Sequence, residues 1–344
     1  MGVRYTRPMV GRARLLELLD RFPRTRVVLW GDLVLDRFVL GTPKRISREA
    51  PVIILRYEGQ RDIPGGAANA LANLAALDVD VRAVGAVGDD EPGRALLEAL
   101  ARQGVDTSGV LPVPGFRTPM KVRLLGGGAC SLKHQMARYD VEDELPGEPD
   151  LHRRLGDLLE AALEGAAAAA VSDYGYGAVA PAVLERVCTG PARPAWITLD
   201  SRYRLGSLGC VDGATPNLEE LEAWAGERLP TDGAVAEGAE NLRRSLGARF
   251  VLATRGNRGM TLVREGSPPV HIPVWGSDEV ADVTGAGDTV LAVLTAALAA
   301  GATPLEAARL ANYGGGIVVM KLGTATATRG ELREAVAADP SLEP

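Results

Sequence analysis

The sequence is poor in cysteine and histidine, and it has no cluster of either. Its 344 residues include three cysteines, Cys130, Cys188 and Cys210. The three histidines are equally scattered, so the closely spaced ligand pairs of a structural zinc site are missing. We therefore predict that the cysteines are reduced and structural, that none is catalytic, and that the protein resides in a reducing compartment.

The sequence also lacks an excess of basic residues and any long apolar run. Lys and Arg number 38 against 44 Asp and Glu, which gives a net charge of -6 and argues against nucleic acid as a partner. The longest apolar stretch, residues 290–300, is far shorter than the roughly 20 residues of a membrane-spanning helix. No apolar segment of a secretory signal stands at the N-terminus. We expect a soluble, cytoplasmic protein with no membrane partner.

Apolar runs that end at turn residues alternate along the chain with amphipathic segments. This alternation predicts an α/β fold, with a mostly parallel sheet flanked by helices. The absence of a long linker predicts a single domain over residues 1–344. The predicted strands are 27–30, 81–87, 166–171, 196–199, 250–253 and 260–263, and the predicted helices include 67–77, 93–103, 155–163 and 290–300.

Two segments, near residues 37–61 and 117–139, read as extended chain with no helical period. They predict strands inserted into the main domain, which would form a small sheet that covers a site like a lid. An ordinary edge hairpin is the alternative. Exposed strand edges attract partners, so the lid predicts a homodimer.

The strongest chemical signal is the segment Asp282-Val283-Thr284-Gly285-Ala286-Gly287-Asp288-Thr289, which leads into the apolar helix. A turn made of Gly285, Ala286 and Gly287 would leave backbone N–H groups at a helix N-terminus, where they bind anions. Asp288 would supply a carboxylate that accepts the proton of an attacking hydroxyl, as phosphoryl transfer requires. The alternative is that Asp288 only caps the helix.

Other nucleotide-binding signatures are missing. No G-x-x-x-x-G-K-[ST] occurs, and Gly126-Gly127-Gly128 lacks the Lys and Ser or Thr of a P-loop. Gly85 and Gly88 lack the third glycine of a dinucleotide fingerprint, which argues against an NAD-dependent oxidoreductase.

Five motifs in this order resemble the ribokinase-like (PfkB-type) carbohydrate kinases. They are Gly31 to Asp36, Gly65-Gly66-Ala67-Ala68-Asn69, Asn217 to Glu220, Thr254-Arg255-Gly256 and Asp282 to Asp288. The resemblance implies a ribokinase-like fold with a small β-sheet lid. It also implies transfer of the γ-phosphoryl group of ATP to a sugar hydroxyl, with Mg²⁺ and with Asp288 as general base.

Within this family the sequence is most similar to the D-glycero-D-manno-heptose 7-phosphate kinases, which form the 1,7-bisphosphate. Residues 45–52, 64–69, 135–140 and 321–324 carry that likeness. The adenylyltransferase fused to some of those enzymes is not expected here. Asp200-Ser201-Arg202 departs from the Asp-Pro-Lys of the family, which keeps a kinase of another sugar or nucleoside open as an alternative. A catalytically inactive sugar- or nucleotide-binding regulator is the other alternative.

The resemblance also assigns roles to individual residues. Asp36, Gly65, Gly66 and Asn69 are expected to bind the sugar, although a turn Asp and an early-helix Asn are the alternatives. Asn217 and Glu220 are expected to organise Mg²⁺ through its waters, the alternative being a solvated helix start with a capping Asn.

Further residues are expected around the nucleotide and beside the anion site. Thr254 and Gly256 are expected to line the nucleotide, and Asn312 to lie near the adenine unless it is a surface residue. Asp282 and Thr284, with the loop at Gly323, resemble a monovalent-cation site that would take K⁺.

Four cationic residues are candidates for holding a phosphate already present on the substrate: Lys121, Arg123, Arg138 and Arg202. Fixed cations and Arg forks are the groups that bind a second anion. Lys121, Arg123 and Arg138 belong to the second lid segment. An exposed hairpin with alternating polar residues would look the same.

Overall fold

The computed structural model describes residues 10–127, 133–276, 282–321 and 323–343. Within these residues nine strands form one large sheet in the order β13-β12-β11-β10-β9-β8-β1-β4-β5. Every neighbouring pair from β11 to β5 is parallel, whereas β12 and β13 are antiparallel additions at one edge. The strands are β1 (Arg26–Gly31), β4 (Asp80–Gly88), β5 (Asp106–Val113), β8 (Ala168–Asp173), β9 (Trp196–Ser201), β10 (Gly213–Ala214), β11 (Phe250–Thr254), β12 (Met260–Arg264) and β13 (Ser267–Ile272).

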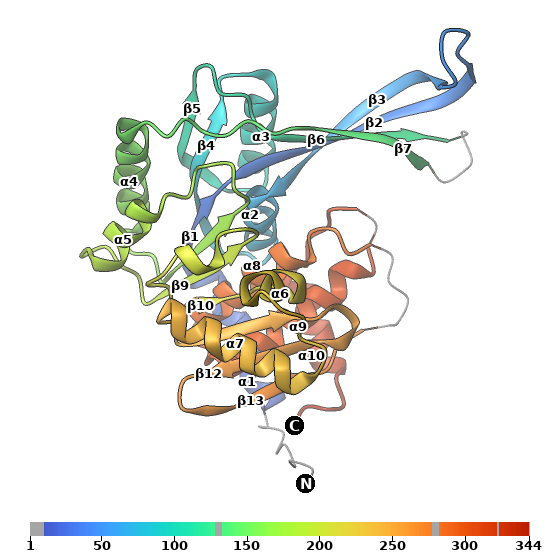
Figure 1. Ribbon diagram of the computed structural model, residues 1–344. Coiled ribbons are helices and arrows are strands. Elements are labelled where there is room, and N and C mark those ends of the chain that lie inside the picture. The colour runs from blue at the N-terminus through green and yellow to red at the C-terminus, as the bar shows by residue number, and fades with distance from the viewer. Residues whose placement is uncertain (1–9, 128–132, 277–281, 322, 344) are drawn as a thin grey trace.

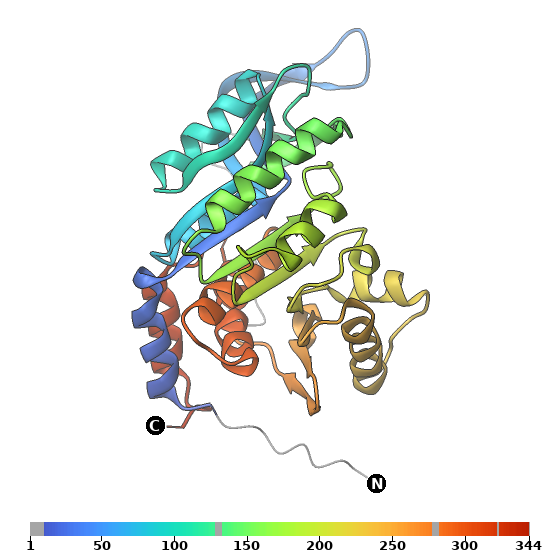
Figure 2. The same cartoon turned by 90° about the vertical axis from the view of Figure 1, so that its left-hand side faces the viewer.

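Helices cover both faces of this sheet (Figures 1 and 2). Successive residues of the central strand β1 alternate between two cores, with Val27 and Leu29 in one and Val28 and Trp30 in the other. A strand buried on both faces reads as a continuous apolar run, which is why the pattern predicted a parallel sheet. One core packs against α1 (Arg12–Arg21), α2 (Ala67–Ala76), α3 (Glu91–Arg102), α8 (Ala286–Ala299), α9 (Pro304–Val319) and α10 (Arg329–Ala338). The other packs against α4 (Pro149–Leu163), α5 (Pro181–Thr189), α6 (Leu218–Ala225) and α7 (Asp232–Leu246).

A second sheet of four strands, in the order β3-β2-β6-β7, projects from the main body (Figure 1). It consists of β2 (Leu33–Ile46), β3 (Ile53–Gly66), β6 (Met120–Gly126) and β7 (His134–Val141). The predicted lid segments therefore form one small sheet rather than separate edge hairpins, and the predicted α/β fold is confirmed. The strands are longer than predicted, because β2 starts directly after β1 and β3 runs into α2. This continuity places the start of the small sheet directly after the carboxyl end of β1.

The prediction of reduced cysteines is wrong for two of them. Cys188 and Cys210 form a disulfide, with Cα atoms 6.1 Å apart and a separation of 22 positions in sequence. The two meet because the chain after β9 turns back against the end of α5, where Cys188 lies. The predicted reducing compartment rested on reduced cysteines, so this pair no longer supports it. Cys130 lies outside the described residues.

In the described part of the chain, no helix is both long enough and apolar enough to span a bilayer.

Candidate active site

The helix α8 begins at the predicted anion-binding turn. Gly285, which precedes it, has a φ of 80°, and a Cβ there would lie 2.5 Å from Asn69 Nδ2. Glycine is therefore required at this position for backbone conformation and for space. The first N–H groups of α8 have no intrahelical partner. That of Ala286 donates to the carbonyl oxygen of Val283 at 3.3 Å, and those that follow it lie at the positive end of the helix. The turn has the geometry of an anion site.

Asp288 is the third residue of α8, and its side chain is 4% exposed. It does not cap the helix. Its carboxylate accepts a hydrogen bond at Oδ2 from Asn69 Nδ2 at 2.8 Å and another at Oδ1 from the Tyr174 hydroxyl at 2.8 Å. Burial raises the pKa of Asp288 to about 6, and these two donors limit the rise because they favour the ionised carboxylate. Such a group can accept a proton near neutral pH.

Asn69 is held by a buried network that the sequence did not reveal. Its carbonyl oxygen Oδ1 accepts from Asn73 Nδ2 at 3.3 Å. Asn73 Oδ1 in turn accepts from Thr289 Oγ1 at 3.0 Å and from the N–H of Ala327 at 3.1 Å. Both atoms of the Asn69 amide have protein partners, so its contacts in this structure orient Asp288. The predicted grip on a sugar hydroxyl stays a prediction.

Asp36 lies on the lid strand β2, where it is buried between the neighbouring lid strands and the loop after α9. Its Oδ2 accepts from Thr324 Oγ1 at 3.1 Å, and its Oδ1 lies 3.0 Å from Arg123 Nη1. That ion pair lacks hydrogen-bond geometry, so both buried atoms keep unused bonding capacity that hydroxyls could fill. A Cβ at Gly65 would come within 2.9 Å of the Asp36 carboxyl carbon, so glycine is needed for this approach. Gly66, with a φ of 54°, makes the turn into α2.

A cavity of about 570 Å³ opens at the carboxyl ends of the central strands, where ligands bind in doubly wound sheets. It brings together Asp288, Gly285 and Gly287 with residues predicted from three other motifs. These are Arg202, Asn217, Glu220 and Thr254. The cavity is also lined by Tyr174, Asp200 and Tyr203, which the sequence did not single out as site residues.

Asn217 and Glu220 form a capping box at the start of α6. Asn217 Oδ1 accepts from the Glu220 N–H and Glu220 Oε2 accepts from the Asn217 N–H, each at 2.9 Å. The two residues therefore cap the helix, as the alternative predicted, and they also line the cavity. Burial raises the pKa of Asp200 and of Glu220, and the charge of Glu220 raises that of Asp200 further. A nearby cation would relieve this charge repulsion.

The described residues contain no group of three or more His, Cys, Asp or Glu side chains that could hold a metal. Asp200 and Glu220 offer two carboxylates on the larger cavity, and Mg²⁺ commonly binds through one or two carboxylates while it keeps several of its waters.

A second cavity, of about 420 Å³, adjoins the first and shares Thr254, Val283 and Gly287 with it. Its walls are largely apolar and come from β12, α8 and α9, with Trp275 on one side. Asn312 lines it, is buried, and donates from Nδ2 to the carbonyl oxygen of Pro273 at 2.9 Å. The surface alternative for Asn312 is therefore wrong. Gly256 also lines this cavity, whose shape and polarity suit an adenine ring.

Asp282 ties the anion site to the loop after α9. Its Oδ1 accepts from the Thr284 N–H at 2.9 Å and its Oδ2 from the Gly323 N–H at 3.1 Å. Although burial opposes it, these bonds hold the pKa of Asp282 below its usual value. The predicted cation site thus gathers the expected residues. Leu322 of this loop lies outside the described residues.

The four predicted cations differ in their partners. Arg123 faces Asp36, and Arg138 donates to Asp140 at 2.6 and 2.8 Å. Lys121 lies over the ring of Tyr174, 5.3 Å from its centroid, and burial lowers its pKa. Arg202 is exposed on the wall of the larger cavity and stacks on Tyr203. Of these four residues, Arg123 and Arg138 form ion pairs with carboxylates, whereas no such pair within 4 Å is found for Lys121 or Arg202 among the described residues.

Several known proteins resemble this chain in sequence. The family described as "pfkB family carbohydrate kinase" matches residues 24–329. The chain is 40% identical over 322 residues to "Bifunctional protein HldE" of Nitrosococcus oceani, covering 92% of this chain and 65% of that protein. It is 41% identical to the HldE protein of Halorhodospira halophila, covering 94% of this chain and 66% of that one. The chain thus spans slightly under two thirds of these relatives.

Solved structures share the fold. The Arabidopsis thaliana ribokinase complexed with ribose and ATP superposes with a TM-score of 0.69 at 20% identity, covering 92% of this chain and 99% of the other. Phosphofructokinase-2 of Escherichia coli does so with a TM-score of 0.72 at 20% identity, covering 91% and 98%. These matches confirm the predicted ribokinase-like fold.

Proposed function

The chain belongs to the pfkB family of carbohydrate kinases, as its motifs predicted, and from this premise we propose that it phosphorylates D-glycero-D-manno-heptose 7-phosphate at the anomeric hydroxyl, with ATP as donor. The observation that carries the proposal is the placement of Asp288. A buried carboxylate with a pKa of about 6 stands beside an anion-binding helix start, at the junction of two cavities.

The adenine of ATP would occupy the smaller, apolar cavity beside Asn312, with its phosphates directed toward the start of α8. Asp288 would accept the proton of the sugar hydroxyl as the hydroxyl oxygen attacks the γ-phosphorus. The bond from that phosphorus to the bridging oxygen breaks, and ADP leaves. The N–H groups of Gly287 and its neighbours would stabilise the negative charge of the transferring group.

Asp200, Glu220 and Asn217 would hold a hydrated Mg²⁺ near the phosphates. The bound ion would neutralise part of the phosphate charge. The loop fixed by Asp282 would take K⁺ and keep the anion site in shape, without contact to the substrate.

Lys121 and Arg202 support a substrate that already carries a phosphate. Lys121 loses hydration through burial, and Arg202 stands on the cavity wall. Burying a cation without an ionic partner is costly, so a phosphate placed between the two would offset that cost. This arrangement favours a sugar phosphate over an unphosphorylated sugar or a nucleoside.

The test is a panel of acceptors assayed for ADP release: the heptose 7-phosphate, fructose 6-phosphate, ribose 5-phosphate, ribose and adenosine. We expect the heptose phosphate to have the highest kcat/KM, by about tenfold or more over the other sugar phosphates. A higher kcat/KM for ribose or adenosine would replace this proposal with the alternative kinase. No ADP release with any acceptor would favour the inactive regulator.

A further inference from the structure

We propose that Tyr174 is a positioning residue for the general base, and that its hydroxyl holds Asp288 ionised and aimed at the acceptor. This inference rests on the proposed role of Asp288 as the base. It concerns the turn after β8, which none of the recognised motifs contains.

Two donors from opposite sides fix the Asp288 carboxylate. The Tyr174 hydroxyl donates to Oδ1 and the Asn69 amide to Oδ2, both at 2.8 Å. With one bond on each oxygen, the carboxylate plane cannot rotate without losing one of them. Each oxygen keeps a second lone pair for the proton of a substrate hydroxyl.

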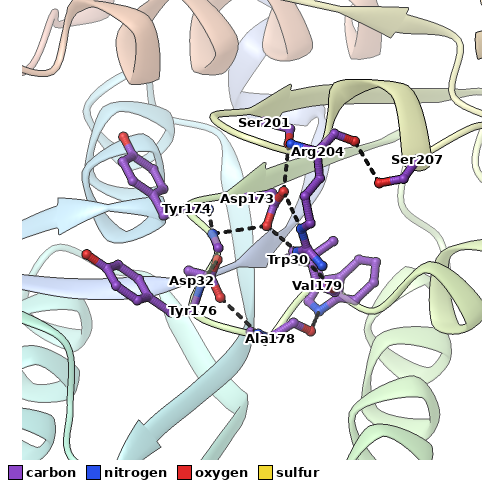
Figure 3. A network of polar contacts seen from close by, with 12 residues as sticks. Trp30, Asp32, Asp173, Tyr174, Tyr176, Ala178, Val179, Ser201, Arg204 and Ser207 are labelled. Atoms are coloured by element: carbon purple, nitrogen blue, oxygen red, sulfur yellow. Dashed lines mark hydrogen bonds and ion pairs between the residues drawn. The ribbon is translucent and has the colours of Figure 1, made fainter. Parts of the chain in front are cut away.

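The turn that carries Tyr174 is itself clamped by Asp32 (Figure 3). Asp32 is 2% exposed, and its carboxylate accepts from the N–H groups of Tyr174 at 2.8 Å, Tyr176 at 3.1 Å and Ala178 at 2.9 Å. Three N–H donors on one buried carboxylate make this turn rigid. A buried acid is costly, and this one supports the turn from which the Tyr174 side chain reaches Asp288.

The preceding residue is fixed just as firmly. Asp173 accepts from Ser201 Oγ at 2.6 Å and forms an ion pair with Arg204 (Figure 3). Arg204 also donates to the carbonyl oxygen of Val179 at 2.9 Å. The backbone on both sides of Tyr174 is therefore anchored to β1 and to the chain after β9.

Several charged groups face Asp288 from the surrounding elements. Lys121 on β6 and Asp36 on β2 act on it in opposite directions, and Asp200 on β9 adds like charge. Arg202 acts on the Tyr174 hydroxyl. Burial raises the pKa of Tyr174 far above its usual value, so the hydroxyl stays protonated and remains a donor at every working pH. Loss of the Tyr174 hydroxyl would make the ionised form of Asp288 less stable relative to its protonated form.

Tyr174→Phe tests this inference, because it removes the hydroxyl and keeps the ring under Lys121. Carboxyl ¹³C NMR of the substrate-free protein labelled at aspartate reports the titration directly, and Asp288→Asn identifies the resonance. We expect the Asp288 midpoint to rise by about one pH unit, since hydrogen bonds to charged groups have that strength. The apparent pKa of the acidic limb of the kcat–pH profile should rise by the same amount, which lowers kcat at pH 6 by about fivefold. The KM for ATP should not change.

Tyr176→Phe is the matched control. Tyr176 lies on the same clamped turn, but its hydroxyl donates to Glu142 at 3.2 Å instead of to the base. This variant should leave the Asp288 midpoint where it is in the wild type. An unchanged midpoint in Tyr174→Phe, or an equal shift in both variants, would overturn the inference.

Two further arms keep the result interpretable. If Tyr174→Phe unfolds, 3-fluorotyrosine at position 174 replaces it, and this stronger donor should lower the midpoint, whereas no shift would contradict the inference. If the acceptor panel fails, the proposed function is refuted, yet the NMR titration still decides whether Tyr174 sets the ionisation of Asp288.

Discussion

At the scale of single residues, the site depends on side chains that do more than one task. Asn69 donates to Asp288 and starts the network through Asn73, and Asn217 caps α6 while it lines the larger cavity. Asp288 combines burial with two donors, which balances its pKa near the pH at which a base is useful.

Replacing Asp288 by Asn should abolish phosphoryl transfer while the protein still binds ATP, because an amide cannot accept the hydroxyl proton. General-base assistance is worth about 10² to 10⁴ in rate, so kcat should fall by that factor. Single-turnover assays and ATP titration by calorimetry measure the two effects. Retention of more than about a tenth of kcat would show that another group is the base.

The same substitution should change stability in a pH-dependent way. The pKa of Asp288 is raised in the folded state to about 6 from 3.8, so its contribution is favourable below pH 4 and is lost as the pH rises through 6. The Asp288→Asn variant has no ionisable group at this position, so it does not lose that stability as the pH rises. Its melting temperature should exceed that of the wild type at pH 7.5, by an amount that corresponds to at most about 3 kcal/mol. At pH 4 the two proteins should melt together, and a constant difference across this range would refute the raised pKa.

Arg202→Ala should raise the KM for the phosphorylated sugar by roughly ten- to a hundredfold and leave the KM for ATP nearly unchanged. A guanidinium can hold two phosphate oxygens at once, and Arg202 lies on the wall of the larger cavity. Arg249→Ala is a suitable control, because Arg249 stacks on Trp196 and does not line that cavity. Equal sugar KM values in wild type and Arg202→Ala would make Arg202 an ordinary loop residue.

At the scale of elements, loops join the helix termini to the rest of the site. Asp282 connects the start of α8 with the loop after α9 through its bonds to Thr284 and Gly323. The position of the anion site therefore depends on both segments.

A potassium ion bound at this junction should activate the enzyme by fixing the loop. Rates measured in potassium chloride should exceed those in tetramethylammonium chloride at equal ionic strength, and Asp282→Asn should reduce the difference. Identical rates in the two salts would remove the cation site from the mechanism.

At the scale of the whole molecule, the lid sheet carries exposed apolar side chains on which we base the prediction of a second copy of the chain. Its exposed large apolar side chains include Ile46, Ile53, Tyr57, Met136 and Tyr139. Apolar groups on open strand edges favour pairing. We predict a homodimer in sedimentation velocity at micromolar concentration, and a shift toward monomer in the double variant Ile46→Lys, Tyr57→Lys. A monomeric wild type would contradict this prediction without affecting the chemistry.

The sequence predicted most of the architecture, because strands buried on both faces and amphipathic helices carry strong local patterns. It also placed Asp288 and the glycines at the start of a helix, since a glycine-containing turn before an apolar helix is a local pattern. The hydrogen bond from Tyr174 to Asp288 was not predictable. Its turn is fixed by Asp32, 142 residues earlier in the chain, and no spacing encodes that contact. The pairing of Cys188 with Cys210 was missed for the same reason, and β10, with two residues, is too short to show a pattern.

The disulfide has one more consequence. Cys188 and Cys210 close a covalent ring of chain that contains β9, Asp200 and Arg202. A protease that cuts once after Arg202 would open this ring without dividing the polypeptide. The nicked protein would migrate as one intact band on a denaturing gel until a thiol is added, and only then as two fragments. The disulfide would therefore keep the segment around Arg202 attached to α5 after its backbone had been cut.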